Sequence, residues 1–144
     1  MYPHVAYFGR KDLQQFHIIR QLINDLSYTI QLVAVPTVRE KDGLAMSSRN
    51  RRIKEEDRPL ANQYYKALLL SREFLRKGEN IPVVKEKVRE FLMQFPLLQL
   101  EYFEVVNTEN FTITDRITNE NQTALCIAGY INNIRLIDNV MYNN

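Results

Sequence analysis

The chain has 144 residues, a formal net charge of +2 and a hydrophobic content of 45%. This length allows one ordinary domain or two small lobes with a real core, and the composition is typical of a folded protein. A net charge this small gives no argument for binding to nucleic acid or to a membrane surface. No apolar stretch reaches the roughly 18 residues of a membrane-spanning helix, and the first residues do not resemble a secretion signal. We therefore expect a cytoplasmic protein.

The first 36 residues have the pattern of a parallel α/β unit. The apolar run Val5–Phe8, which stops at Gly9, predicts a buried strand. Apolar residues spaced three and four apart from Phe16 to Leu26 predict a helix, and the β-branched run Ile30–Val35 predicts a second strand. This order predicts a βαβ unit, which implies a parallel sheet with a right-handed crossover. The chain opens almost directly on a strand, which is typical of a portion of a longer protein.

A polar and basic segment follows from residue 37 to residue 54. A loop of about this length inside a compact domain usually serves a function or is disordered. Within its first part, Thr37–Arg52, Leu44 and Met46 are the only large apolar side chains that we expect to dock the loop. We therefore predict that Thr37–Arg52, without a ligand, exchanges its amide hydrogens faster than any other internal segment.

The remainder of the chain predicts an α+β lobe. The first predicted helix of this lobe begins with the acidic residues Glu55–Asp57 and ends with basic residues before Gly78, as the helix dipole favours. The dipeptide Asn132-Asn133 tolerates the positive φ of a hairpin turn. The predicted elements are helices at Glu55–Lys77 and from Pro82 to Phe95, and strands at Leu100–Asn107, Thr123–Ile131 and Ile134–Tyr142.

The tetrapeptide Gly9–Asp12 lies between the first predicted strand and the predicted helix. Open α/β sheets bind nucleotides at this position. Gly9 permits close backbone approach, Lys11 is a mobile charge for a phosphate, and Asp12 can accept hydrogen bonds from ribose hydroxyls. The alternative is a simple helix cap, with Asp12 as the capping acid and Lys11 as a solvated charge. Gln15 can hydrogen-bond a substrate carboxylate or hydroxyl, or it is an ordinary exposed helix residue.

Two serines and an arginine, Ser47, Ser48 and Arg49, follow a glycine in the long loop. Adjacent hydroxyls, exposed backbone N–H groups and a guanidinium suit a triphosphate or a leaving pyrophosphate. Residues 49–58 hold five cations and three acids. A solvated basic loop is therefore the alternative.

Several other kinds of site are excluded by the composition and the motifs. The chain has one cysteine and two histidines, so it offers no metal cluster of the Cys/His type. Cys126 lies in the apolar run Ala124–Ala128, which predicts a buried and inert thiol. The Walker P-loop, the Gly-x-Gly-x-x-Gly fingerprint and the nucleophile-elbow Gly-x-Ser-x-Gly do not occur in the sequence.

Three blocks of sequence together resemble the pantothenate synthetase (pantoate–β-alanine ligase) family. They are Tyr-Phe-Gly-Arg-Lys-Asp-Leu-Gln-Gln at 7–15, Val-Pro-Thr-Val-Arg-Glu at 35–40 with Asp-Gly-Leu-Ala-Met-Ser-Ser-Arg-Asn at 42–50, and Arg-Leu-Ile-Asp-Asn at 135–139. The resemblance implies an α/β then α+β fold. Residues 1–36 would be the end of a Rossmann-like nucleotidyl-transfer domain. Residues 37–144 would be a lid domain of helices packed on a short antiparallel sheet, with Met-Ser-Ser-Arg as its phosphate loop.

The resemblance also implies a two-step reaction. ATP and pantoate form pantoyl adenylate and pyrophosphate, with Mg²⁺ bound through the ATP phosphates, and β-alanine then displaces AMP to give pantothenate. Matched by position, the catalytic residues are Lys11, Ser47, Ser48 and Arg49, and Gln15 binds pantoate. The ATP site comprises Gly9, Arg10, Lys11, Asp12, Val38, Met46, Ser47, Ser48 and Arg49, with Val38 against adenine. The family also suggests a homodimer for a full-length protein, without protein ligands to the metal.

One family motif has no counterpart in the chain. The phosphate-binding His-x-Gly-His motif belongs to an earlier strand–helix turn of the family, and His4 and His17 do not form it. We therefore expect the chain to be a portion of the ligase that is inactive alone. Two alternatives stay open: an enzyme completed by a second chain, and a non-catalytic nucleotide-binding or interaction module that kept the lid fold.

Overall fold

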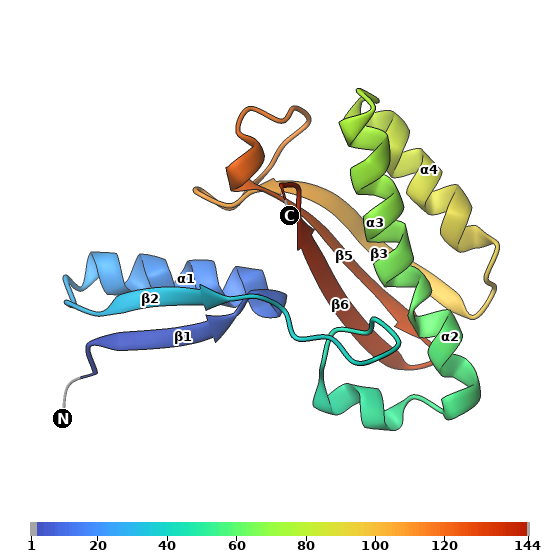
Figure 1. The fold of residues 1–144 in the computed structure, drawn as a ribbon, viewed down its shortest axis with the longest axis horizontal. Helices are drawn as coiled ribbons and strands as arrows, with labels where there is room; N and C mark the ends of the chain where they lie inside the picture. Colours follow the sequence, from blue (N-terminus) through green and yellow to red (C-terminus); the bar gives the residue numbers. More distant parts are fainter. Residues whose placement is uncertain (1–2, 144) are drawn as a thin grey trace. The chain divides into compact units, whose positions relative to one another are not determined.

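The structure, a computed structural model, describes residues 3–143. The chain divides into two compact units, Met1–Val38 and Arg39–Asn144 (Figure 1). The boundary lies two residues beyond the division expected from the sequence. Within residues 3–143, no helix has both the length and the apolar character needed to cross a membrane.

The first unit is a βαβ unit. It consists of strand β1 (Val5–Gly9), a 3-10 turn η1 (Arg10–Asp12), helix α1 (Leu13–Asp25) and strand β2 (Gln31–Val35). The two strands pair in parallel, from Val5 opposite Gln31 to Gly9 opposite Val35. Phe8 of β1 packs edge-on against Phe16 of α1, with ring centroids 6.4 Å apart. The predicted parallel unit is confirmed.

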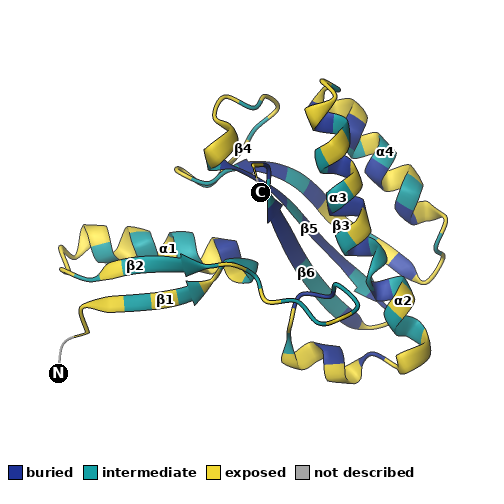
Figure 2. Ribbon diagram, viewed as in Figure 1, coloured by how far each residue is buried: buried dark blue, intermediate teal, exposed yellow. Residues whose placement is uncertain are grey.

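The prediction that β1 is fully buried is wrong. Tyr7 is 69% exposed and Val5 is 36% exposed, while Ala6 and Phe8 are half-buried. Figure 2 shows β1 in the colours of exposed and intermediate positions. Successive side chains of a strand point to opposite faces of the sheet. Helix α1 packs on the face that carries Phe8, and the described part of this unit has no second helix to cover the opposite face.

The second unit is an α+β lobe with a four-stranded antiparallel sheet of order β4-β3-β5-β6. Helices α3 and α4 cover one face of this sheet, and the hydrophobic core lies between the two helices and the sheet (Figures 1 and 2). Asn132, in the turn between β5 and β6, has a φ of 51°, which confirms the predicted hairpin turn. The elements are η2 (Ser48–Arg52), η3 (Glu55–Asp57), α2 (Arg58–Ala61), α3 (Gln63–Arg76), α4 (Ile81–Met93), β3 (Leu98–Asn107), β4 (Thr112–Ile113), η4 (Glu120–Gln122), β5 (Thr123–Ile131) and β6 (Ile134–Met141).

The single helix predicted over Glu55–Lys77 is divided in the structure. Its acidic start forms the separate 3-10 turn η3, and Asn62 separates α2 from α3. The backbone of Asn62 keeps helical angles (φ −68°, ψ −13°), so the interruption is a slight one. Pro59 lies in the first turn of α2, where its missing N–H removes no helical hydrogen bond.

Tyr64 fixes helix α3 to the sheet at Gly129. The Tyr64 side chain is buried, and its hydroxyl lies 2.9 Å from the carbonyl oxygen of Tyr130 and 3.1 Å from that of Gln99. Burial raises the pKa of Tyr64 to about 12, so the hydroxyl keeps its proton for donation. A Cβ atom on Gly129 would lie 2.3 Å from this hydroxyl oxygen. The sheet therefore needs a glycine here to admit the tyrosine.

We expect Gly129→Ala to lower the free energy of unfolding by about 2–3 kcal/mol, because the added methyl group must displace Tyr64 or the sheet backbone. Tyr64→Phe removes only the hydrogen bond and should cost about 1 kcal/mol. Urea denaturation measures both. Gly9→Ala is the control, since a Cβ atom there would meet no atom within 4 Å. Equal unfolding free energies for the two glycine variants would contradict this account of the contact.

Candidate functional site

The first group of predicted site residues lies at the carboxyl end of β1. The strand ends at Gly9, η1 follows, and α1 begins at Leu13, which is buried. Lys11 is half-buried, and Asp12 and Gln15 are exposed. Asp12 occupies the N-cap position of α1, but its side chain makes no capping hydrogen bond there.

Gly9 has no conformational requirement of its own in this unit. Its φ is −66°, which any residue can adopt, and the space beside its Cα is open. An open space at the end of a parallel strand suits the close approach of a ligand to the backbone. The nucleotide-binding role predicted for Gly9–Asp12 stays a prediction, and the open space beside Gly9 supports it.

The second group lies in the long loop of the other unit. Ser48 and Arg49 are exposed, and Met46 is 57% exposed. Ser47 precedes η2, and its Oγ accepts a hydrogen bond of 3.2 Å from the backbone N–H of Arg49. Leu44 is buried, as expected of an anchor for the loop, whereas the Met46 side chain is mostly exposed. Val38, expected against adenine, is exposed at the end of the first unit.

The loop begins with a tight hairpin that the sequence did not predict. Arg39 and Ala45 form an antiparallel bridge. The N–H of Glu40 donates to the carbonyl of Leu44 at 2.8 Å, and the N–H of Gly43 donates to the carbonyl of Glu40 at 2.9 Å. Gly43 has a φ of +95°, a conformation that favours glycine. This glycine therefore has a backbone role in forming the turn.

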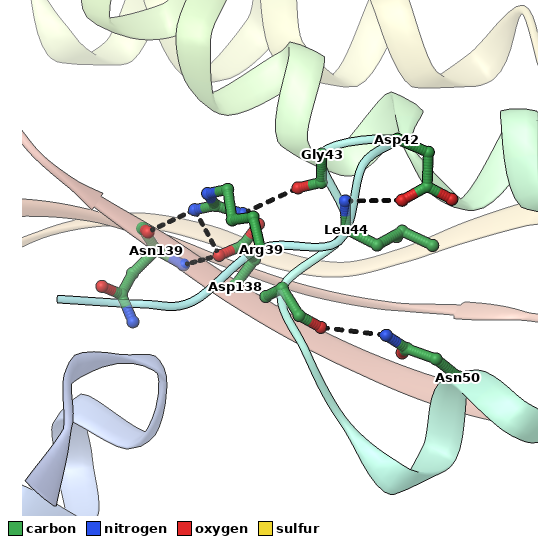
Figure 3. Close-up of polar contacts among 8 residues, drawn as sticks. Arg39, Asp42, Gly43, Leu44, Asn50, Asp138 and Asn139 are labelled. Carbon is green, nitrogen blue, oxygen red and sulfur yellow. Dashed lines mark hydrogen bonds and ion pairs between the residues drawn. The ribbon is translucent and has the colours of Figure 1, made fainter.

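Arg39 fastens the hairpin to the sheet (Figure 3). Its guanidinium makes two hydrogen bonds to the carboxylate of Asp138 in β6, at 2.7 and 3.0 Å. It also donates to the carbonyl oxygens of Gly43 at 3.1 Å and Asn139 at 3.3 Å. The same guanidinium lies over the ring of Tyr65, 3.7 Å from its centroid. The ion pair is nearly buried, so the hairpin is tied firmly to the lobe.

Asn50 and Arg58 hold the two arms of the loop together. The Asn50 side chain is buried, and its Nδ2 donates to Oε1 of Glu40 at 2.5 Å and to the carbonyl of Ala45 at 3.1 Å. Arg58 donates to Oε2 of Glu40 at 2.6 Å and to Oδ2 of Asp42 at 2.9 Å. The hydrogen bond from Asn50, and then that from Arg58, lower the pKa of Glu40. The Glu40 carboxylate is therefore charged at neutral pH.

The assumption that only two apolar side chains hold the loop is wrong, because hydrogen bonds of Arg39, Asn50 and Arg58 also hold it. We now expect slow amide exchange at Glu40 and Gly43, whose N–H groups are hydrogen-bonded in the hairpin, and faster exchange at the exposed Ser48. Hydrogen exchange of the nucleotide-free chain, resolved over residues 37–54, measures this. Uniformly fast exchange across the segment would contradict the hairpin.

Residues 39–45 therefore pack for structural reasons. The predicted phosphate role of Ser47, Ser48 and Arg49 consequently rests on the family resemblance and on the exposure of Ser48 and Arg49.

Arg39, Glu40, Asn50 and Asp138 all lie within the three resembling blocks, but the sequence alone predicts no role for them. The alternation of charge from Arg39 to Asp42 was a signal of ion pairing. The partners were not visible, because Arg39 and Asp138 lie 99 positions apart. Asp138 of the third block (135–139) therefore binds Arg39 of the second block and holds it in place.

Cys126 is a free cysteine in β5 that is half-buried, not fully buried as predicted. Burial raises its pKa to about 12, and the carboxylates of Asp138 and Glu104 contribute to the rise. A thiolate is the reactive form of cysteine, and it does not form near neutral pH with such a pKa. In the part of the chain that the structure describes, no group of three or more His, Cys, Asp or Glu side chains could hold a metal ion.

The two units define a class of protein: a parallel βαβ unit with polar residues at a strand end, followed by an α+β lobe that carries a Ser-Ser-Arg segment in which Ser48 and Arg49 are exposed. Known proteins share both parts. The sequence profile of the pantoate-beta-alanine ligase family matches residues 1–141. The pantothenate synthetase of Thermosipho africanus is 39% identical over 140 residues, which are 96% of this chain and 49% of that protein.

Solved structures agree. The crystal structure of pantothenate synthetase from Thermus thermophilus matches with a TM-score of 0.90 at 36% identity, over 97% of this chain and 50% of that one. The ligase of Francisella tularensis matches with a TM-score of 0.63 at 28% identity, over 99% of this chain and 45% of that one. The chain belongs to the pantoate–β-alanine ligase family. It spans about half the length of the pantothenate synthetases it matches.

Proposed function

We propose that this chain supplies part of an ATP-dependent ligase that joins pantoate to β-alanine through a pantoyl adenylate, releasing AMP and pyrophosphate. The observation that carries the proposal is the family match over residues 1–141, because this range includes all three motif blocks. The structure of the Francisella tularensis ligase is described as complexed with β-γ ATP and β-alanine. That description supports ATP and β-alanine as substrates of the ligase to which this chain contributes.

We infer the following roles for the residues of the two groups. Lys11 and Arg49 would contact phosphate oxygens, since both carry charges that can stabilise a developing pyrophosphate. Asp12, whose side chain does not cap α1, would accept hydrogen bonds from ribose hydroxyls, and Gln15 would bind pantoate. The other ATP contacts would come from Gly9, Arg10, Val38, Met46, Ser47 and Ser48.

Mg²⁺ would be bound through the phosphate oxygens of ATP and would supply positive charge to offset that of the leaving pyrophosphate. For the full-length protein we propose a homodimer in the cytoplasm, as the family resemblance implies. The unit boundary at Val38 and Arg39 would then separate the end of the Rossmann-like domain from the lid domain.

The test is an assay coupled to AMP release. The chain of residues 1–144 alone should give no AMP above background from ATP, pantoate and β-alanine, because it contains no His-x-Gly-His motif. A longer protein that carries this segment together with that motif should release AMP only when both pantoate and ATP are present. Turnover by the 144-residue chain alone would contradict its expected inactivity. AMP release without any need for pantoate would overturn the proposed function.

A further inference from the structure

The short segment Met46–Arg49 lies between two residues, Ala45 and Asn50, that are hydrogen-bonded to each other. Ala45 before it and Asn50 after it are both buried. Nδ2 of Asn50 donates to the carbonyl oxygen of Ala45 at 3.1 Å, which joins the residues on either side of the segment. The backbone N–H of Asn50 donates to the carbonyl of Ser47 at 3.1 Å. One buried side chain thus closes the base of the exposed segment.

The contacts of Asn50 require an amide. Both partners of Nδ2, the Ala45 carbonyl and the Glu40 carboxylate, are acceptors, so an NH₂ group must face them. Glu40 is itself held by Arg58 of α2 at 2.6 Å. An aspartate at position 50 would have nearly the same shape, but it would place a second negative charge against Glu40.

We propose that Asn50 is a positioning residue, which sets the backbone of Met46–Arg49 so that its hydroxyls and guanidinium meet the phosphates of ATP. This inference rests on the proposed function. Asn50 is 3% exposed, so it acts through the segment that it closes. Preorganised donors stabilise a transition state without reorganising during the reaction, and a displacement of about 1 Å can lower a rate by about 100-fold.

The experiment uses a full-length ligase that carries this segment. In Asn50→Asp, we expect ATP–pyrophosphate exchange at saturating ATP to fall by about 10- to 100-fold. Capture of β-alanine from preformed pantoyl adenylate should stay near its normal rate. Asn50→Ala removes the same hydrogen bonds without adding a charge, and it should show the same division between the two half-reactions.

Ser71→Ala is the matched control for lost stability. Ser71 is fully buried, and its Oγ donates to the Leu68 carbonyl within α3 at 2.8 Å. At a temperature where all variants are folded by circular dichroism, Ser71→Ala should keep normal exchange. If it loses as much exchange as Asn50→Asp, general destabilisation explains both and the inference is overturned.

Arg49→Ala separates failure of this inference from failure of the proposed function. If Arg49→Ala loses pyrophosphate exchange while Asn50→Asp keeps it, the positioning role is wrong and the proposed function stands. If Arg49→Ala keeps normal exchange as well, the segment does not contact phosphate, and the inference fails together with the role proposed for the loop.

Discussion

Arg39→Ala is expected to lower the free energy of unfolding of the second unit by about 3 kcal/mol. Arg39 and Asp138 are 18% and 8% exposed at their side chains, so the substitution leaves a carboxylate almost out of water without its cation. It also removes the donor to the Gly43 carbonyl and the stacking on Tyr65. Truncating one partner of a buried pair is costly mainly because the other charge stays unpaired.

Thermal and urea unfolding of the chain measure this loss. Arg135→Ala is the matched control, because Arg135 makes a similar two-bond contact with Glu101, at 2.7 and 3.2 Å, on the open surface of the same lobe. Its loss should be much smaller, since solvent screens an exposed pair. If both arginine variants were destabilised equally, burial would not be the reason for the strength of the Arg39 contact.

Arg49→Ala in a full-length ligase is expected to slow pantoyl adenylate formation by about 10²- to 10³-fold, which corresponds to the loss of one charge-assisted contact in the transition state. Lys11→Ala should have an effect of the same size, because both side chains are assigned to phosphate. Unfolding free energy should change little in Arg49→Ala, since this side chain is exposed. ATP–pyrophosphate exchange measures the first half-reaction separately from the capture of β-alanine.

Arg51→Ala is the control for charge in the same loop. Arg51 is exposed and two positions away, and no phosphate role is proposed for it, so exchange should be close to normal. Normal exchange in Arg49→Ala and Lys11→Ala, with failure of the β-alanine step alone, would show that the two roles are assigned to the wrong half-reaction.

The sequence by itself determined the order and type of the main elements and the family. The βαβ unit, the hairpin at Asn132 and the helix-then-sheet order of the lobe depend on hydrophobic periodicity and turn chemistry, which lie within a few neighbouring residues. Three short blocks, at 7–15, 35–50 and 135–139, were specific enough together to indicate the ligase family, and the match over 1–141 confirms it.

Only the tertiary structure decided which of the motif residues hold the fold. In the sequence, Arg39 and Glu40 lie in a polar and basic loop without visible partners. In the folded lobe, Asp138 contacts Arg39, and Asn50 and Arg58 contact Glu40. Gly129 is required because Tyr64, from a different element, reaches into the sheet beside it. Such contacts join residues tens of positions apart, and local periodicity carries no information on which distant side chains meet when the chain buries its apolar faces.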